Sequence, residues 1–573
     1  MSKIFERGKG EVKFSKNDFA SSGGEAKVYK KGNVCYKIFH SPSKMIPEAK
    51  IGELQTLNRD NIIKPFNILL NDKNTPIGFT SSWVEGIPMC KVFVTGFRKR
   101  NNITDDHTLE LVKNIQDTIK YIHSKKCLIV DGNEMNYLVG NDFITPYFID
   151  VNSWQTPSFP ATALMDSIKD WEHENKFTEL SDWYAFAVIS CWLFSGIHPF
   201  RGNHPDYIDK DIHVRTKRRT LDRVSIFHPD VLLAPNVRIS SIPSHYKEWY
   251  LRIFDKGERS LPPGEAGIII AVPIDPTIIK GTDNFIIKEL QTYKNDISWY
   301  AKIHGMKVLK TSESFYVNNK ELKAPNEFDI IFSLVKQVPI FTRIVNKNVD
   351  FITFENYTIR DSFLMGSESI IIGNHVYIKS NDKLIEMYAI DDSHQNRVIP
   401  IVKHTWDIMP NSSELFAGVI YQNMLEQPYI SIPVPSSNKA SAMYTKKIQE
   451  IKDHKILDGK HDNHVVSLFT SYKGDYKVII LRFDKDYNKY DYREIKVGNI
   501  GDINMITLDN GVCIIIPENG ILEVFGNKPF VNDVKSIHDP VITTDMRLCK
   551  DGTSAMFFKD KTLYSIRMNN GSK

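Results

Sequence analysis

The sequence predicts an α+β region followed by an all-β region, and three observations support this division. The chain has 573 residues, more than one hydrophobic core normally serves. Up to residue 262, short strands alternate with long helical patterns, whereas after residue 310 short alternating strands are separated by Asn, Asp, Gly and Lys turns. A stretch rich in Pro and Gly, residues 257–267, is typical of a boundary. We therefore expect domains at 1–262 and 311–573, with residues 263–310 as a linker and the start of the second domain.

Two long helices stand out in the first region. Residues 107–125 place apolar side chains at helical spacing, which predicts an amphipathic helix. Residues 181–195 are apolar nearly all round, as a buried helix should be. Asp182, near the start of the second helix, is expected to cap it or to bond neighbouring backbone.

The second region reads as a repeat of short strands. Examples are residues 350–355, 375–379, 477–483, 511–516 and 562–566. A unit of turn, strand, turn and strand recurs roughly every 40 to 60 residues, the range of propeller blades. This length predicts a β-propeller of about five to seven blades, and a pair of stacked β-sandwiches would give a similar pattern.

Composition excludes several classes of protein. A net charge of +4 gives no argument for binding nucleic acid or a membrane surface. The six cysteines are scattered without a CxxC pair, which argues against a structural zinc site and a disulfide framework and favours reduced thiols in a cytosolic setting. The N-terminus lacks the apolar core of a signal peptide, and no apolar stretch is long enough to cross a bilayer. We expect a cytoplasmic protein that contacts no membrane.

The spacing of three polar residues is the first indication of chemistry. Asp131 is followed five positions later by Asn136, and Asp150 ends an apolar strand. In phosphoryl-transfer sites, one carboxylate orients the acceptor hydroxyl, while a carboxamide and a second carboxylate hold Mg²⁺. Upstream, Gly23 and Gly24 lie between two short strands, and Lys37 lies on the second of them. Taken singly, Gly23 and Gly24 are more typical of a hairpin turn, and Lys37 of a solvated strand, than of a phosphate site.

In order along the chain, these features resemble the protein-kinase superfamily over residues from about 15 to 262. The resemblance is closest to divergent bacterial and phage kinase-like domains with the motifs GGE-x-x-VYK and IDV-x-S-W-Q. These motifs correspond here to residues 23–30 and 149–155. The resemblance implies a bilobal α+β protein-kinase-like fold that binds ATP and Mg²⁺.

The resemblance also implies a role for each matching residue. Lys37 would bind the ATP phosphates, Asp131 would be the catalytic aspartate, and Asn136 and Asp150 would be the magnesium ligands. Further residues complete the implied site: Gly23, Gly24 and Val28 in the glycine loop, Trp83, Val84 and Glu85 in the adenine-binding hinge, Asn133 beside a phosphate, Asp182 bracing the catalytic loop, and Arg259 in a buried ion pair.

The sequence departs from the kinase pattern at several positions. Ile129 and Val130 replace the usual His-Arg, Asn133 replaces a lysine, and Val151 and Asn152 replace Phe-Gly. Ser21 and Ala26 replace two of the three loop glycines. No Ala-Pro-Glu motif is present, so Arg259 lacks its expected partner. The helix glutamate that should pair with Lys37 is either Glu48 or Glu53, because Lys50 occupies the expected position.

Three functions are compatible with this pattern. The first is an atypical Ser/Thr protein kinase whose C-terminal domain recruits a protein substrate or an assembly partner. The second is a pseudokinase scaffold, for example within a phage particle, which would place the chain in the host cytoplasm or the virion. The third is a small-molecule phosphotransferase of the same superfamily.

Two basic runs and two histidines are interpreted as structural features without a functional role. Two basic runs, residues 97–100 and residues 215–219 with Arg223, are expected to be solvated surface. His198 and His204 lack the spacing of zinc motifs and are expected to be turn and packing residues.

Overall fold

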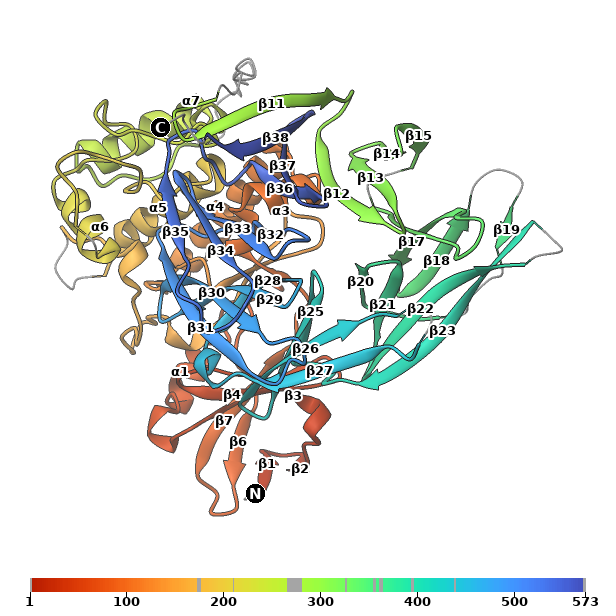
Figure 1. The fold of residues 1–573 in the computed structure, drawn as a ribbon. Coiled ribbons are helices and arrows are strands. Elements are labelled where there is room, and N and C mark those ends of the chain that lie inside the picture. The colour runs from red at the N-terminus through yellow and green to blue at the C-terminus, as the bar shows by residue number, and fades with distance from the viewer. Residues whose placement is uncertain are drawn as a thin grey trace.

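The computed structural model describes residues 3–172, 177–209, 211–264, 281–324, 327–353, 357–359, 364–392, 396–436 and 439–569. The molecule is mostly β, with 42% of it in strands and with few helices. An N-terminal region, residues 3–264, contains the long helices, and an all-β region, described over residues 281–569, consists of antiparallel sheets (Figure 1).

A seven-stranded sheet begins the N-terminal region. Its strand order is β2-β1-β6-β7-β5-β4-β3, and every pairing is antiparallel. A short helix, α1 (Glu48–Leu54), follows β5 and buries Ile51 and Leu54. The strands are β1 (Ile4–Glu6), β2 (Gly10–Val12), β3 (Phe19–Ser22), β4 (Ala26–Lys31), β5 (Val34–Phe39), β6 (Ile68–Asn71) and β7 (Pro76–Ser82).

The rest of the N-terminal region is mainly helical and carries one small sheet, of order β10-β9-β8. The helices are α2 (Met89–Val92), α3 (Thr95–Arg100), α4 (Asp105–Ser124), α5 (Glu179–Ser195), α6 (Ile212–Leu221) and α7 (Ser244–Tyr250). The strands are β8 (Ile87–Pro88), β9 (Tyr137–Val139) and β10 (Pro146–Phe148). Shorter helical turns are η1 (Lys16–Asp18), η2 (Pro42–Lys44), η3 (Val151–Ser153), η4 (Asp166–Ile168), η5 (Ile239–Ser241), the π-helical η6 (Leu251–Asp255) and, in the all-β region, η7 (Gln449–Ile451).

The two long helices form where the hydrophobic pattern predicts them. Thr104 caps α4 by accepting a hydrogen bond from the His107 backbone at 3.3 Å, and acidic residues fill the first turn of this helix. Helix α5 is buried on all sides from Asp182 onward and ends at Gly196, whose φ of 77° suits a residue without a Cβ. Packing of α4 against α5 forms the centre of the region.

The all-β region forms seven sheets within the described residues. Each is an antiparallel sheet of three to five strands, apart from one parallel pairing of β19 with β23. The first three sheets contain β12 (Ile297–Ile303), β13 (Met306–Thr311), β14 (Ser314–Val317) and β15 (Lys320–Lys323); then β16 (Asp329–Phe332), β17 (Pro339–Val345) and β18 (Asn348–Thr353); then β19 (Thr358–Ile359), β20 (Glu368–Ile372), β21 (His375–Ser380), β22 (Lys383–Asp391) and β23 (Arg397–Asp407). The next three contain β24 (Ser413–Phe416), β25 (Val419–Met424), β26 (Gln427–Val434) and β27 (Ala442–Lys447); then β28 (Lys455–Asp462), β29 (Val465–Tyr472), β30 (Asp475–Phe483) and β31 (Tyr490–Val497); then β32 (Met505–Thr507), β33 (Val512–Glu518), β34 (Ile521–Gly526) and β35 (Lys535–His538). The seventh sheet combines β36 (Arg547–Asp551), β37 (Ser554–Lys559) and β38 (Thr562–Met568) with β11 (Phe285–Thr292).

These sheets follow one another around a closed ring (Figure 1). One strand of each sheet contacts a strand of the next: β16 with β20, β20 with β24, β24 with β28, β28 with β32, β32 with β36, and β36 with β12. Phe315 and Phe341, with ring centroids 5.1 Å apart, pack the sheet of β12 against that of β16. The earliest strand, β11, pairs with the last strand, β38, so the two ends of the ring are joined within one sheet.

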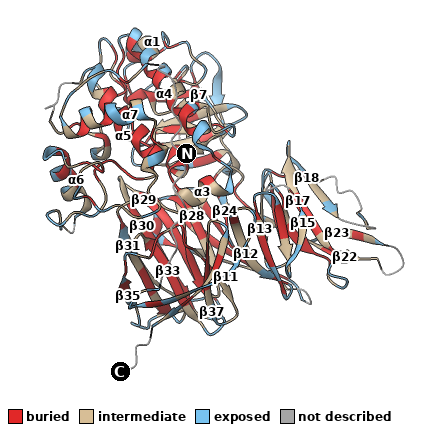
Figure 2. Cartoon of the chain, turned by 90° about the horizontal axis from the view of Figure 1, so that it is seen from above, coloured by how far each residue is buried: buried red, intermediate tan, exposed pale blue. Residues whose placement is uncertain are grey.

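The two regions pack tightly against each other. One hydrophobic cluster includes α4 and α5 residues together with Phe469, Ile500 and Ile515 of the all-β region, and Figure 2 shows buried residues continuing from helices into sheets. The basic run 97–100 lies at this boundary: Arg98 is buried, Lys99 pairs with Asp560 at 2.7 Å, and Arg100 pairs with Asp502 at 2.8 Å. The expectation of solvated surface is therefore wrong for this run, because acids of the second region neutralise it.

The expected linker, residues 263–310, is partly folded. Strands β11 and β12 lie within it, while residues 265–280 lie outside the described residues. Among the described helices, none has the length and apolar character needed to span a membrane.

Candidate functional site

Asp131 and Asn136 lie in the loop that connects α4 to β9. The Asn136 amide donates to the backbone carbonyl of Asp131 at 2.8 Å and to its carboxylate at 3.2 Å. The other carboxylate oxygen of Asp131 accepts from the Met165 backbone at 2.8 Å. Only 7% of Asp131 is exposed, and burial raises the pKa of its carboxyl group, although hydrogen bonds from Asn133, Met165 and Asn136 oppose the shift.

Asp182 holds this loop in an unusual backbone conformation. Val130 has a φ of 61°, which a β-branched residue rarely adopts. The buried Asp182 carboxylate accepts hydrogen bonds from the backbones of Ile129 and Val130, each at 2.8 Å, and from His123 at 2.9 Å. One charged side chain on α5 therefore orients the segment that precedes Asp131.

Lys37 and Asp150 meet beside this loop. Asp150 follows β10 with a φ of 58°, and its carboxylate forms an ion pair with Lys37, which lies on β5. The Lys37 ammonium also donates to Asn152 at 3.1 Å. Because the Ile149 backbone donates to the carbonyl of Asn136 at 3.0 Å, the segment carrying Asp150 is fixed directly against the loop of Asp131 and Asn136.

Neither helix glutamate pairs with Lys37, which corrects the expectation for Glu48 and Glu53. Glu48 forms two hydrogen bonds of 2.7 Å with Arg7, and Glu53 accepts from the Ser158 backbone at 3.2 Å. Helix α1 directs Lys50 inward instead, where its ammonium donates to the carbonyl of Pro160 at 3.4 Å and burial lowers its pKa. Within the described structure, Lys37 forms its ion pair with Asp150 and donates a hydrogen bond to Asn152.

Gly23 and Gly24 form an open turn between β3 and β4. A Cβ added at either position would have no neighbour within 4 Å, so protein packing does not require glycine there. The turn is fixed by Gly23, whose backbone donates to Ala26 at 3.0 Å and whose carbonyl bonds His40 at 2.8 Å. Val28, on the following strand, lies opposite Lys37 in the sheet.

The segment of Trp83, Val84 and Glu85 links β7 to β8. The Trp83 backbone donates to Asn33 at 2.9 Å, and its indole donates to Glu85 at 2.9 Å. Burial alone would raise the pKa of Glu85, but hydrogen bonds from Lys30 and Trp83 hold it below its usual value. Both side chains are thus anchored to the sheet, while Val84 remains half-buried.

Asn133 lies inside the loop and is 1% exposed. Its side-chain oxygen accepts from the Met135 backbone at 2.8 Å, and its amide faces the Asp131 carbonyl at 3.5 Å. The side chain supports the loop and leaves little surface for a ligand.

Arg259 has a partner that sequence reasoning missed. Its guanidinium binds both carboxylate oxygens of Asp170, at 2.6 and 2.7 Å, and lies over the ring of Tyr184 at 4.7 Å. Both charged side chains are buried. The buried ion pair that the resemblance implied for Arg259 is therefore present, but its acid comes from the segment before α5 and not from an Ala-Pro-Glu motif.

The all-β region touches the site from two directions. Glu426, in the turn between β25 and β26, accepts from Ser22 at 3.0 Å and pairs with Lys27 at 2.6 Å, on either side of the glycine turn. Tyr476 donates its hydroxyl to Glu134, three residues after Asp131, and both groups are buried. No signal in the sequence marks these contacts, because their partners are more than 300 residues apart.

Comparison of the sequence with protein-family models gave no match, and comparison with curated proteins also gave none.

Proposed function

We propose that this chain is an ATP- and Mg²⁺-dependent phosphotransferase of the protein-kinase type, acting on a Ser or Thr hydroxyl of a protein. One observation carries the proposal: Lys37, Asp131, Asn136 and Asp150 come from three separate segments and form one connected group. Lysine, catalytic aspartate and two oxygen-bearing magnesium ligands are the groups that phosphoryl transfer most requires.

The residues fit the cofactor in their chemistry. Asn136 and Asp150 offer the carboxamide and carboxylate oxygens that Mg²⁺ prefers. The open turn at Gly23 and Gly24 leaves the space that phosphate oxygens need near backbone amides. Bound ATP with Mg²⁺ would supply the phosphoryl group and the charge that stabilises its transfer.

Each residue then has a defined task. Lys37 and Asp150 neutralise each other in an ion pair. When ATP and Mg²⁺ bind, Lys37 would pair with a phosphate and Asp150 with the metal ion instead. Asp131 would accept the proton of the acceptor hydroxyl, and its raised pKa makes it a better proton acceptor than an ordinary carboxylate. Asp182 would keep Asp131 in place, and Val84 would offer backbone groups to adenine.

We further propose that the N-terminal region is a bilobal kinase-like fold, with the seven-stranded sheet and α1 as one lobe and the helices as the other. The ring of seven sheets would be a β-propeller whose remaining loops recruit a protein substrate or an assembly partner. The separation of the seven-stranded sheet from the helices supports the bilobal fold. The series of seven sheets, closed by the pairing of β11 with β38, supports the propeller. A cytoplasmic location, of a host cell or within a virion, is part of the same proposal.

A pseudokinase scaffold is the second candidate, and specific contacts favour it. Asp150 is engaged by Lys37, Asp131 is engaged by the Met165 backbone, and Glu426 of the all-β region holds the glycine turn. A protein that binds nucleotide without transferring phosphate could keep all of these contacts.

Incubation with γ-labelled ATP and Mg²⁺ tests the two candidates. We expect label on the chain itself or on an added protein, and Asp131→Asn should abolish transfer while Asp117→Asn, an exposed position on α4, should not. A thermal shift with ATP but no transfer would favour the scaffold, and no ATP binding would reject the phosphotransferase while leaving a ligand-free scaffold. Transfer only to a small hydroxylated compound would favour a small-molecule phosphotransferase.

A further inference from the structure

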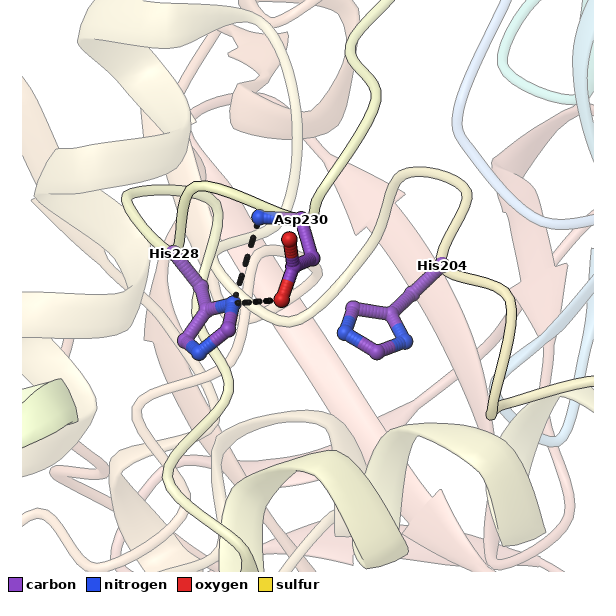
Figure 3. Close-up of side chains that lie close together, drawn as sticks. All are labelled: His204, His228 and Asp230. Atoms are coloured by element: carbon purple, nitrogen blue, oxygen red, sulfur yellow. Dashed lines mark hydrogen bonds and ion pairs between the residues drawn. The ribbon is translucent and has the colours of Figure 1, made fainter.

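Two loops of the N-terminal region bring two histidines and an aspartate together (Figure 3). His204 lies before α6, whereas His228 and Asp230 lie after it. One potential ligand atom from each of the three side chains falls within 4.8 Å of the other two. The carboxylate of Asp230 is 3.8 Å from Nδ1 of His228, and the His204 ring faces both.

The backbone around this cluster is fixed by interactions that do not involve the three side chains. Asn203 and Leu232 exchange two backbone hydrogen bonds, at 3.0 and 2.8 Å, which join the two loops. Arg219, which is 1% exposed, donates to the carbonyl of Gly202 on one side at 2.9 Å and to that of Val224 on the other at 3.0 Å. The two loops therefore stay adjacent, and the three side chains stay on one face.

We propose that His204, His228 and Asp230 form a binding site for a divalent transition-metal ion, with Zn²⁺ as the preferred ion. Imidazole and carboxylate are the ligands that Zn²⁺ takes in three-residue sites, where a water fills the fourth position. Zinc bonds of about 2.0 Å in a tetrahedron place neighbouring ligand atoms about 3.3 Å apart. The His228 and Asp230 ligand atoms, 3.8 Å apart, are close to this separation, and His204, whose ligand atom lies within 4.8 Å of both, would move closer to complete the site.

The hydrogen bonds that the two histidine rings accept are weak enough to be exchanged. Nδ1 of His204 accepts from the Asp206 backbone at 3.2 Å, and Nδ1 of His228 accepts from the Asp230 backbone at 3.3 Å. Both distances are at the long end of the hydrogen-bond range. Binding through the ring nitrogens would replace these contacts, and where Nε2 of His204 becomes the ligand, its proton moves to Nδ1.

The proposed ion would link the loops on the two sides of α6. Sequence reasoning took His204 for a packing residue, because its partners lie 24 and 26 positions further along the chain and no short motif connects them. A repeated tripeptide, His-Pro-Asp at residues 204–206 and 228–230, is the only trace of the pairing in the sequence.

Isothermal titration calorimetry of tag-free full-length protein with ZnCl₂ tests the site. We expect one Zn²⁺ per chain, and His228→Gln or Asp230→Asn should weaken binding at least about tenfold, because even residues that only support a metal ligand usually cost that much when replaced. His538→Gln, an exposed histidine on β35, is the matched control and should bind as the wild type does. Equal affinity in all variants, or no stoichiometric binding by the wild type, would overturn the proposal.

A second measurement does not depend on the stability of these variants. Co²⁺ replaces Zn²⁺ and reports its ligands in the visible spectrum, so His228→Cys should bind Co²⁺ with a new thiolate-to-metal absorption band. A Co²⁺ spectrum of this variant without that band would show that residue 228 is not a ligand.

Discussion

Replacing Asp182 by alanine should release the loop that positions Asp131. The buried carboxylate accepts two backbone hydrogen bonds of 2.8 Å and a third from His123 at 2.9 Å. Hydrogen bonds to a charged group contribute about 1.5–3 kcal/mol each, and donors left buried without a partner add a further penalty. Since local rearrangement recovers part of this loss, we expect Asp182→Ala to lower the free energy of unfolding by about 3–5 kcal/mol.

Hydrogen exchange gives the local readout for this change. Because every 1.4 kcal/mol is about a tenfold change in an equilibrium constant, the amides of Ile129 and Val130 should exchange at least about tenfold faster in the variant. Asp106→Ala, an exposed first-turn residue of α4, is the control and should change stability by about 1 kcal/mol or less. Unchanged exchange at Ile129 and Val130 in Asp182→Ala would refute the idea that this carboxylate sets the loop conformation.

Three further predictions concern contacts that hold the molecule together. Arg259→Ala should destabilise the N-terminal region by about 3–5 kcal/mol, because it removes the guanidinium that binds both oxygens of the buried Asp170 carboxylate. Chemical denaturation would measure this loss, and a loss below about 1 kcal/mol would contradict the prediction. Burial alone raises the pKa of Glu426, but hydrogen bonds from Lys27 and Ser22 lower it overall, so its contact with the glycine turn is stable above pH 4.5 and weakens as pH falls through the folded pKa. After correction for intrinsic exchange rates, the protection of the amides of residues 22–27 should therefore fall in acid, and Glu426→Gln should remove most of this pH dependence. Deleting residues 562–573, which include β38, should open the ring and expose the edge of β11. We expect a lower melting temperature and, because an exposed edge strand pairs with other chains, self-association in light scattering. An unchanged melting temperature would show that the β11–β38 pairing does not close the ring.

Sequence patterns predicted the helices well, because their hydrophobic spacing is local. Residues 107–125 and 181–195 correspond to α4 and α5 within two residues at each end. Strand predictions at 375–379 and 477–483 coincide with β21 and β30 for the same reason, whereas the end of the strand at 350–355 lies partly outside the described residues. The recurrence of strands indicated a repeat of about five to seven units, and seven sheets are present in the described residues.

Tertiary partners could not be predicted in this way. Lys37 binds Asp150 instead of a helix glutamate, because α1 turns Lys50 inward and leaves Glu48 to Arg7 on the surface. Asp170 becomes the partner of Arg259 through packing around Tyr184, which no spacing rule contains. Contacts from Glu426 and Tyr476 to the site depend on how the ring docks on the helices, and they connect residues more than 300 positions apart.

Binding of Mn²⁺ together with ATP is a direct test of the proposed phosphotransfer site, because Mn²⁺ accepts the same oxygen ligands as Mg²⁺ and is visible by electron paramagnetic resonance. We expect wild-type protein to bind Mn²⁺ and ATP as a ternary complex, and Asp150→Asn to weaken this binding at least about tenfold, because the variant loses a metal-ligand carboxylate. Asp166→Asn, an exposed aspartate on η4, should bind like the wild type. Equal Mn²⁺ and ATP binding by Asp150→Asn and the wild type would contradict the assignment of Asp150 and, with it, the proposed phosphotransfer site.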